Sequence, residues 1–209
     1  MIPLPDLIAI QEELARRVRI ARLEEPPRLV AGVDAAYKNG VVRAGVAVFS
    51  WPERRLVRRA SAEVPEEFPY MPGFLSFREL PALLGALGKL PERPDLILVD
   101  GQGIAHPRGL GIASHLGVIT GIPTIGSAKS RLIGEFREPG PERGSWEPLF
   151  YRGRRVGAVL RTRSGVRPVF VSPGHLVSLE DAIEFVLGFC TKFRIPEPVR
   201  EADRISRFT

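Results

Sequence analysis

The spacing of hydrophobic and polar residues predicts a helix and then three β-strands in the first third of the chain. Residues 1–18 carry the pattern of an amphipathic helix. Asn39-Gly40 separates two apolar runs, and this dipeptide is a strong signal for a tight hairpin. The three runs that read as strands cover residues 28–37, 41–50 and 54–64. We therefore expect the fold to begin with an antiparallel meander.

Helices and strands alternate in the remainder of the chain. The run 95–100 is short and almost wholly apolar, as in strands buried on both faces of a sheet. The other expected elements are helices over 76–89, 110–120 and 178–190, a helix after Pro196, strands over 123–129 and 167–173, and a hairpin over 148–163. Together they predict a single α/β domain, residues 1–209, in which parallel strands follow the meander and helices cover the faces of a mixed sheet.

Composition places this chain among folded proteins. With 209 residues and 44% apolar content, it is large enough for one domain with a sizeable core. No apolar run approaches the roughly 20 residues of a membrane span, and the N-terminus lacks the pattern of a signal peptide. We therefore expect a cytoplasmic protein with no membrane partner. Cys190 is the only cysteine, which excludes an internal disulfide framework, and with only three histidines a structural zinc site is not expected.

The net charge of +6 comes mainly from arginine. Arginine contacts phosphate groups well, so this charge favours a polyanionic partner such as nucleic acid. An Ala-, Gly-, Pro- and Arg-rich composition also follows from GC-rich codons. Composition alone supports the two interpretations equally.

Three acidic residues lie at positions where a folded protein gains little from a carboxylate. Asp34 interrupts an apolar strand, Asp100 ends the most apolar strand, and Glu79 lies among apolar residues of a helix. Each alone is compatible with a strand-end cap, an ion pair or a charge on a helix face. Because the first strand and the next parallel strand can be neighbours, the three acids can also meet in one cluster. Such a cluster suits Mg²⁺, which prefers carboxylate oxygens.

Lys129 ends the strand over 123–129 and can add a positive charge beside the same cluster. Carboxylates that hold divalent cations, together with a lysine near a phosphate, are the groups that a phosphodiester nuclease requires. The acids and this lysine therefore predict nuclease chemistry.

The segment after Asp100 contains Gly101, Gly103 and His106. The glycines permit a close approach to the backbone, so a flat ligand can lie against this loop. The segment does not fit a dinucleotide-binding motif, because a His-Pro pair stands where the helix should already run. His106 is a candidate catalytic residue that can assist at the leaving oxygen or contact a phosphate. The alternative is a loop histidine with satisfied hydrogen bonds. We interpret His115 and His175 as a packing residue and a turn residue.

The segment FPYMPGF places Tyr70 and Met71 between two prolines that stiffen the backbone. A rigid aromatic tip on a basic protein can insert between stacked bases and support a flipped nucleotide. The alternative is a loop held in place by its own aromatic packing.

Five motifs together resemble the endonuclease V family, the deoxyinosine-directed nucleases. They are GVDAAY, PYMPGFLSFREL, DLILVDGQGIAHPRGLGIASHLG, PTIGSAKSRL and VSPGH, in that order, and the resemblance extends from about Leu7 to Asp203. It implies an RNase H-like fold and a DNA-repair enzyme that uses Mg²⁺ or Mn²⁺. It also implies hydrolysis of the second phosphodiester bond 3′ to a deaminated adenine, which leaves 3′-hydroxyl and 5′-phosphate ends.

The resemblance also implies roles for individual residues. Asp34, Glu79 and Asp100 match the metal-binding acids, and Lys129 matches the active-site lysine. A strand-separating wedge, usually Tyr-Ile-Pro, corresponds to Tyr70, Met71 and Pro72, so Met71 is a mild departure. Asp203 stands where some members carry a histidine near the metal, and we expect an outer ligand there, with a surface acid as the alternative. The expected pocket for hypoxanthine is lined by Gly73, Leu75, Gly101, Gly103, Gly111, Ile112 and Leu132.

Other functions remain compatible with parts of this pattern. The main alternative is a ribonuclease that acts on inosine in single-stranded RNA. A Holliday junction resolvase or an RNase H would not need the wedge loop, and a non-catalytic inosine-binding module would not need the acids. We expect a monomer whose partner is DNA containing deoxyinosine, with inosine RNA as the alternative substrate.

Overall fold

The first half of the sheet is an antiparallel meander, as the sequence predicts. The computed structural model describes residues 3–208. Strands β1 (Leu29–Lys38), β2 (Val41–Ser50) and β3 (Leu56–Pro65) pair in order. Asn39 and Gly40 join the first two strands with φ angles of 51° and 75°. Both residues are in the left-handed region that the tightest hairpin turns require, and this explains the Asn-Gly sequence.

Two parallel strands continue the sheet. Helix α2 (Leu75–Leu87) leads to β4 (Leu96–Val99), which pairs in parallel with β1, and α3 (Ile112–Thr120) leads to β5 (Thr124–Ala128), which pairs in parallel with β4. Every residue of β4 is buried. A strand covered on both faces needs no polar alternation, which explains the continuous apolar run.

The second edge of the sheet is antiparallel again. Strands β8 (Val169–His175), β7 (Arg154–Leu160) and β6 (Trp146–Tyr151) complete the order β3-β2-β1-β4-β5-β8-β7-β6. The predicted mixed α/β sheet, with the meander first and parallel strands after it, is therefore confirmed. The interpretation of His175 as a turn residue is wrong: it is the last residue of β8 and is buried.

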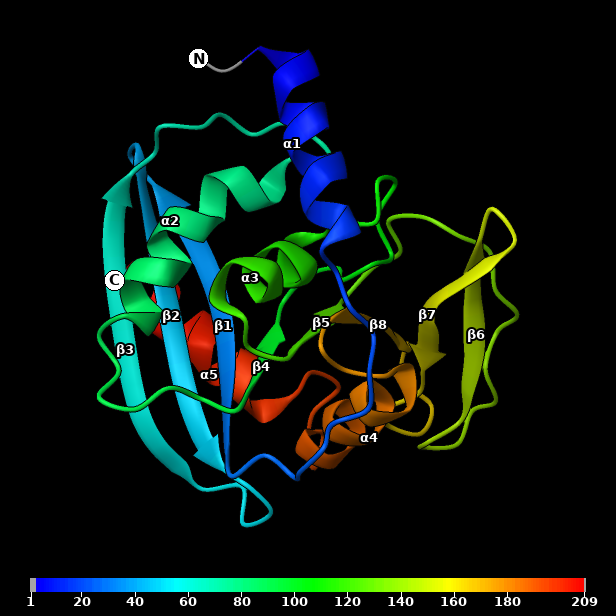
Figure 1. Cartoon of the computed structure of the whole chain (residues 1–209). Helices are drawn as coiled ribbons and strands as arrows, with labels where there is room; N and C mark the ends of the chain where they lie inside the picture. The colour runs from blue at the N-terminus through cyan, green and yellow to red at the C-terminus, as the bar shows by residue number, and fades with distance from the viewer. Residues whose placement is uncertain (1–2, 209) are drawn as a thin grey trace.

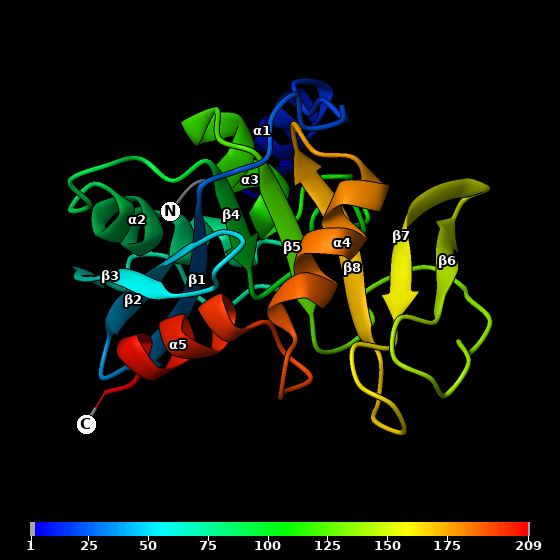
Figure 2. The ribbon, with the colours of Figure 1, turned by 90° about the horizontal axis from the view of Figure 1, so that it is seen from below.

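Helices cover both faces of the sheet (Figures 1 and 2). Helices α1 (Leu4–Arg16), α2 and α3 lie on one face, and α4 (Leu179–Phe189) and α5 (Glu197–Ser206) lie on the other. Each face has its own hydrophobic cluster against the sheet. A capping box begins α4, where Ser178 and Asp181 exchange hydrogen bonds. Among residues 3–208, no helix has the length and apolar content needed to cross a membrane.

Candidate active site

The pairing of β1 with β4 brings two of the predicted acids to one position on the sheet. Val33 and Val99 are register partners, and the amide of Asp100 donates to the carbonyl of Val33 at 3.3 Å. Asp34 and Asp100 follow these partners directly, so they are neighbours on adjacent parallel strands. Side chains at matching positions of neighbouring strands project from the same face of the sheet. The sheet topology therefore brings together carboxylates that are 66 residues apart in the sequence.

Glu79 reaches the same region from α2, which packs on β1, β2 and β3. Its side chain is only 7% exposed and accepts a hydrogen bond from the hydroxyl of Tyr37 on β1. Arg78, the next residue back on α2, lies over the ring of Tyr37 at 3.6 Å. Tyr37 is a site residue that the sequence analysis missed, because only the pairing of helix with strand brings it to Glu79.

The acids repel one another electrostatically. Burial raises the pKa of Asp34 to about 8, and the negative charges of Asp100 and Glu79 add to this effect, while Lys129 opposes it. Burial, with the charge of Asp100, also raises the pKa of Glu79 to about 7, against the hydrogen bond from Tyr37. A bound cation would relieve this repulsion. The donor set consists of carboxylate oxygens, and it therefore fits a hard divalent cation such as Mg²⁺ or Mn²⁺.

These carboxylates do not yet form a ready coordination shell. Over residues 3–208, no three His, Cys, Asp or Glu side chains are arranged to hold one metal ion together. Instead, Asp100 pairs with the ammonium group of Lys129, and Glu79 is held by Tyr37. Asp100 and Glu79 are thus each engaged by a protein side chain. A cation would have to compete with those partners.

Lys129 lies just beyond the end of β5 and is half-exposed. Burial lowers its pKa, but the hydrogen bond and charge of Asp100, with Asp34 and Asp203, outweigh burial and raise the pKa above its ordinary value. Lys129 is therefore a stable cation at neutral pH. Asp203 comes from α5, which packs on β1 and β2, and its carboxylate pairs with Arg207 at 2.5 Å. It contributes to the negative field around Lys129 while remaining engaged elsewhere.

A pocket of about 410 Å³ opens beside Asp100 and Lys129. Three segments form it: the loop before α2, the loop between β4 and α3, and the segment after β5. The predicted wedge and pocket residues that line it are Tyr70, Met71, Pro72, Gly73, Leu75, Gly101, Gly111, Ile112 and Leu132. The structure thus places the pocket directly beside the carboxylate cluster.

Gly103 does not line this pocket, contrary to the sequence-based expectation. It is buried against β8, where its amide donates to Ser172 at 2.7 Å and a Cβ atom would overlap the carbonyl of Pro173. A Cβ atom at Gly111 would likewise overlap the carbonyl of Gln102, and one at Gly101 would meet the side chain of Ile112. The close approaches that these glycines permit are therefore mainly to the protein itself.

Gln102 is a second residue that the sequence analysis missed. It lines the pocket, its amide nitrogen donates to the carbonyl of Ser130 at 3.0 Å, and its amide oxygen is buried with no partner in the described part of the chain. Its bond to Ser130 joins the loop after β4 to the segment after Lys129. One feature of the sequence could have identified Gln102: it is a polar residue between two glycines in the segment directly after Asp100.

The loop before α2 has an anchored base and an exposed tip. Phe68 and Phe77 stack with ring centroids 5.7 Å apart, and Phe74 packs beside Phe77 at 6.1 Å. Tyr70, in contrast, is 65% exposed and Met71 is half-buried. The loop is therefore held by its own aromatic packing at the base, while its tip projects over the mouth of the pocket.

The carbonyl of Gly73 is the main attachment point of this loop. It accepts hydrogen bonds from Gln11 on α1 at 2.9 Å, from Arg108 at 2.9 Å and from His106 at 3.1 Å. Arg108 also donates to the side chain of Gln11, and its amide donates to the other ring nitrogen of His106 at 3.3 Å. Gly73 has a φ angle of +79°, which favours glycine. We call Gln11, Gly73, His106 and Arg108 the loop clamp.

His106 has the contacts of a positioning residue. Both of its ring nitrogens face backbone groups of the loop clamp, and the side chain is 5% exposed. Burial and the neighbouring charge of Arg108 lower its pKa to about 4, so the ring is neutral at pH 7. These contacts favour the interpretation of a satisfied loop histidine, and the predicted role at the leaving oxygen stays a prediction.

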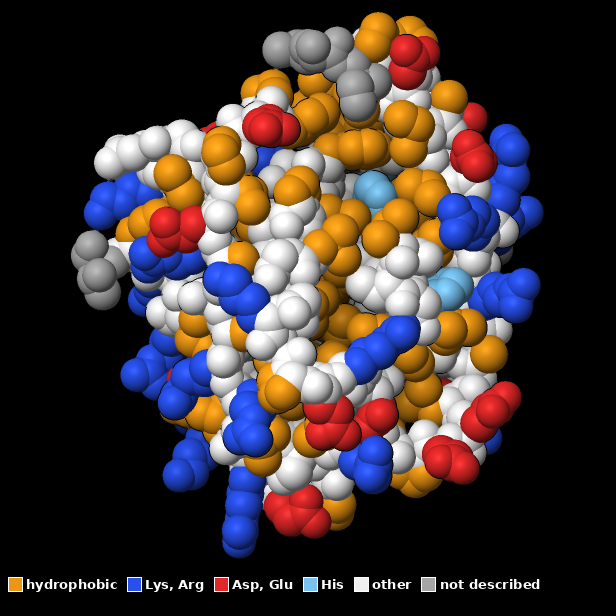
Figure 3. Space-filling model, turned by 60° about the vertical axis from the view of Figure 1, so that its left-hand side comes forward, with side chains coloured by type: hydrophobic (Ala, Val, Ile, Leu, Met, Phe, Trp, Pro, Cys, Tyr) orange, Lys and Arg blue, Asp and Glu red, His pale blue; other side chains and the backbone are white. Residues whose placement is uncertain are grey.

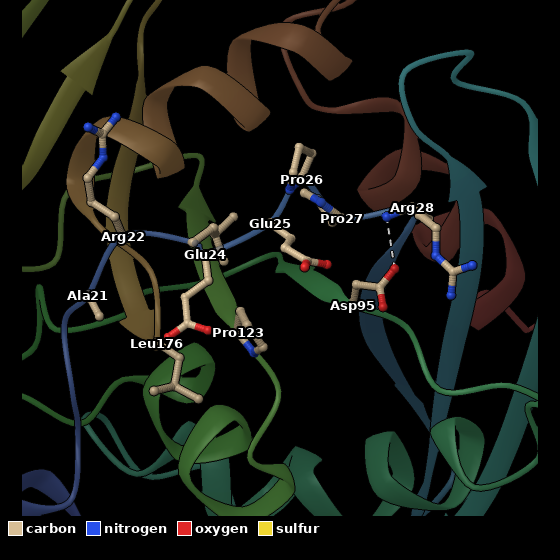
Figure 4. Close-up of a pocket in the computed structure, with 11 residues that line it drawn as sticks. Ala21, Arg22, Glu24, Glu25, Pro26, Pro27, Arg28, Asp95, Pro123 and Leu176 are labelled. Atoms are coloured by element: carbon tan, nitrogen blue, oxygen red, sulfur yellow. Dashed lines mark hydrogen bonds between the residues drawn. The ribbon is translucent and has the colours of Figure 1, made fainter.

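A larger hollow of about 820 Å³ lies elsewhere, beside residues 21–28 (Figure 4). Asp95 is one of its acids, but this carboxylate is occupied by the amides of Arg28 and Leu29 at 2.8 and 2.9 Å. Asp95 precedes β4 and Pro123 precedes β5, so this hollow lies at the amino ends of the parallel strands. Ligand sites of open α/β sheets form at the carboxyl ends, where the carboxylate cluster lies.

Comparison with known proteins identifies the family. The family model described as Endonuclease V matches residues 12–204. The chain is 54% identical to an endonuclease V of Trichormus variabilis over 204 residues, covering 96% of this chain and 92% of that protein. A crystal structure of endonuclease V from Streptomyces avermitilis superposes with a TM-score of 0.94 at 45% identity, covering 99% of this chain and 92% of the other.

A third relative has been crystallised with nucleic acid. Ciona intestinalis endonuclease V, in complex with a 24mer DNA containing an inosine followed by a ribo-adenosine, superposes with a TM-score of 0.83 at 30% identity. The match covers 97% of this chain and 95% of that one. On the extent and identity of these matches, the chain belongs to the endonuclease V family and is an endonuclease.

Proposed function

We propose that this endonuclease recognises deoxyinosine in DNA and hydrolyses the second phosphodiester bond on its 3′ side, as a step in DNA repair. The observation that carries the proposal is the position of the 410 Å³ pocket. Its lining includes Asp100 of the carboxylate cluster and Lys129, which pairs with Asp100. A base held in the pocket would bring the adjoining backbone to these charged groups. The crystallised complex of the Ciona intestinalis relative with inosine-containing DNA supports the choice of lesion.

In this proposal Asp34, Glu79 and Asp100 would hold Mg²⁺, or Mn²⁺ in its place, and Asp203 would be an outer ligand. The bound ion would supply an oriented water and stabilisation of the charge that develops on the phosphate. Tyr37 holds Glu79 in place through its hydroxyl. Lys129, which lines the pocket beside Asp100, would place its positive charge next to the scissile phosphate.

The projecting loop acts as the wedge. Tyr70, Met71 and Pro72 would fill the space that the extruded nucleotide leaves in the base stack, and the exposed ring of Tyr70 is free to stack. Met71 replaces the usual isoleucine with a flexible apolar side chain that can still fill this space. His106 acts through the loop clamp to position Gly73 at the pocket wall.

We further propose that the enzyme works as a cytoplasmic monomer.

The test is cleavage of an end-labelled duplex with one deoxyinosine, with Mg²⁺ or with EDTA, mapped to the nucleotide. We expect a Mg²⁺-dependent nick at the second phosphodiester bond 3′ to the lesion, with none in the undamaged duplex. A strand of the same sequence with inosine in RNA is run in parallel. Cleavage of the RNA alone would replace the DNA substrate with inosine RNA, and equal cleavage of undamaged DNA would contradict lesion recognition.

A further inference from the structure

A basic groove lies on the far side of the loop that forms the pocket wall. It has a volume of about 780 Å³ and is bounded by α1, by residues 104–109 and by the hairpin of β6 and β7. Figure 1 shows α1 at the top and the turn that joins β6 and β7 at the upper right, and residues of both line the groove. Its charged lining residues are Glu12, Arg16, Arg108, Arg152, Arg154 and Arg155.

Most of the arginines in this basic groove are not neutralised by the protein. Arg155 pairs with Glu180 at 3.2 Å, and Arg108 is used by the loop clamp. Arg16, Arg152 and Arg154 make no side-chain hydrogen bond or ion pair within residues 3–208. With Arg155 paired to Glu180, one lining acid remains against four arginines, and the groove is positive. A concave surface of one charge concentrates the field and attracts a polyanion.

The basic groove adjoins the proposed lesion pocket. His106 lines both, because the loop over residues 101–111 separates them and presents one side to each. Tyr151 adds an aromatic ring beside Arg152, whose guanidinium lies 5.1 Å from the ring centroid. Arg16 also borders a shallow hollow that contains Arg17 and Arg19, so the positive surface continues past the end of α1.

We propose that the basic groove binds the sugar-phosphate backbone of duplex DNA flanking the lesion, and that this contact contributes affinity without reading sequence. The inference rests on the proposed function, in which the pocket holds the lesion. It adds a second surface, outside the pocket, that contacts DNA. Arginines that are free of internal partners can form bidentate contacts with phosphates. Each such contact releases counterions and makes affinity depend on salt.

The test compares two double variants of equal charge. Arg152→Gln with Arg154→Gln removes two groove charges at the exposed hairpin turn. Arg55→Gln with Arg58→Gln is the matched control, because both residues are exposed and lie near β3, at the opposite edge of the sheet from β6. Both variants lower the net charge equally from +6. Affinity and kcat/KM are measured over a range of salt concentrations.

Two substrates are used: a short oligonucleotide limited to the lesion and the scissile bond, and a duplex extended by about ten base pairs on each side. We expect the groove variant to lose about tenfold in affinity for the extended duplex near 0.1 M salt. The slope of log affinity against log salt concentration should become shallower by about 1.8, because two phosphate contacts are lost. The short substrate should be processed as by the unmodified enzyme, and the control variant should match the unmodified enzyme on both.

An equal loss in the control variant would overturn the inference, since total charge would then explain the effect. Unchanged affinity for the extended duplex, or an equal loss on the short substrate, would also overturn it. Failure of the proposed function has a different signature. The unmodified enzyme would then treat deoxyinosine and undamaged duplexes alike, while the groove variant would still bind the undamaged extended duplex more weakly than the control.

Discussion

At the scale of single residues, the site depends on groups whose charges are controlled by burial and by one another. Asp34 and Glu79 have raised pKa values, whereas His106 and His115 have pKa values lowered to about 4. The same burial that disfavours a free carboxylate also disfavours a charged imidazole. The acids can have their charge balanced by Lys129 or a cation, but the histidines can only remain neutral.

Replacing Asp100 with asparagine should reduce cleavage about a thousandfold, because several kcal/mol of charge stabilisation would be lost. The side chain keeps its size, so the fold should be retained. Cleavage rates are compared with thermal unfolding of the same variant and with its affinity for the lesion duplex. If the loss of activity merely follows a loss of folded protein, Asp100 has a structural role and the metal assignment fails.

Acid should destabilise the protein through His115. Its ring is 5% exposed, donates to or accepts from Ser76 at 2.9 Å, and has a pKa of about 4 in place of 6.5 because of burial. Between pH 6.5 and 4, His115 is therefore protonated in the unfolded chain but neutral in the folded chain. The free energy of unfolding falls as pH falls through this range. Between pH 7 and 5 the loss is about 2 kcal/mol for this residue.

Urea unfolding of the unmodified protein and of His115→Gln, at pH 7 and at pH 5, measures this contribution. The variant starts less stable, because its packing against Phe77 changes, but it should lose about 2 kcal/mol less between the two pH values. His106 remains in both proteins and cancels in the comparison. Equal acid sensitivity in the two proteins would show that His115 is not the responsible group.

At the scale of elements, the wedge loop is positioned by a helix that begins the chain. Gln11 on α1 is fully buried and bonds both to Gly73 and to Arg108. Helix α1 also contacts α3. Through Gln11, the loop before α2 is therefore attached to α1 and to Arg108 in the loop that precedes α3. Elements from three distant parts of the sequence therefore determine the position of Tyr70 over the pocket mouth.

Substituting Gln11 with alanine should loosen the wedge loop. The carbonyl of Gly73 and the guanidinium of Arg108 would each lose one hydrogen bond, at a cost of about 1–3 kcal/mol in stability. We expect weaker binding of the lesion duplex, by about tenfold, with Mg²⁺ affinity unchanged because the carboxylates are not touched. Glu13→Ala, an exposed change on the same helix, is the control. A loss of Mg²⁺ affinity equal to the loss of DNA affinity would contradict a role confined to the loop.

At the scale of the whole molecule, the arrangement of charge matters more than its total. Lys and Arg side chains are spread along both borders of the face in Figure 3, so the net charge of +6 does not by itself locate a binding surface. The position of the basic groove beside the pocket is what gives part of this charge a specific use. The two hydrophobic clusters hold helices on both faces, and the rigid sheet between them supports the site.

The helices, the strands and the type of chemistry could all be predicted from local patterns in the sequence. Periodicity, the Asn39-Gly40 turn and the capping box at Ser178 depend on local interactions, and each predicted element is present in the structure. The candidate acids could also be recognised in the sequence. Burial of an unpaired carboxylate costs free energy, so an acid such as Asp100 at the end of a buried strand indicates a function. The family resemblance added the expected role of Asp203.

Which residues come into contact could be seen only once the chain was folded. The parallel register of β1 and β4 brings Asp34 to Asp100, α2 brings Glu79 to Tyr37, and α1 brings Gln11 to the wedge loop. The tertiary structure also showed that Gly103 packs against β8 and does not line the pocket. The physical reason is that periodicity records which side of an element is buried, whereas contacts between distant segments follow from sheet order and packing, which no local pattern contains.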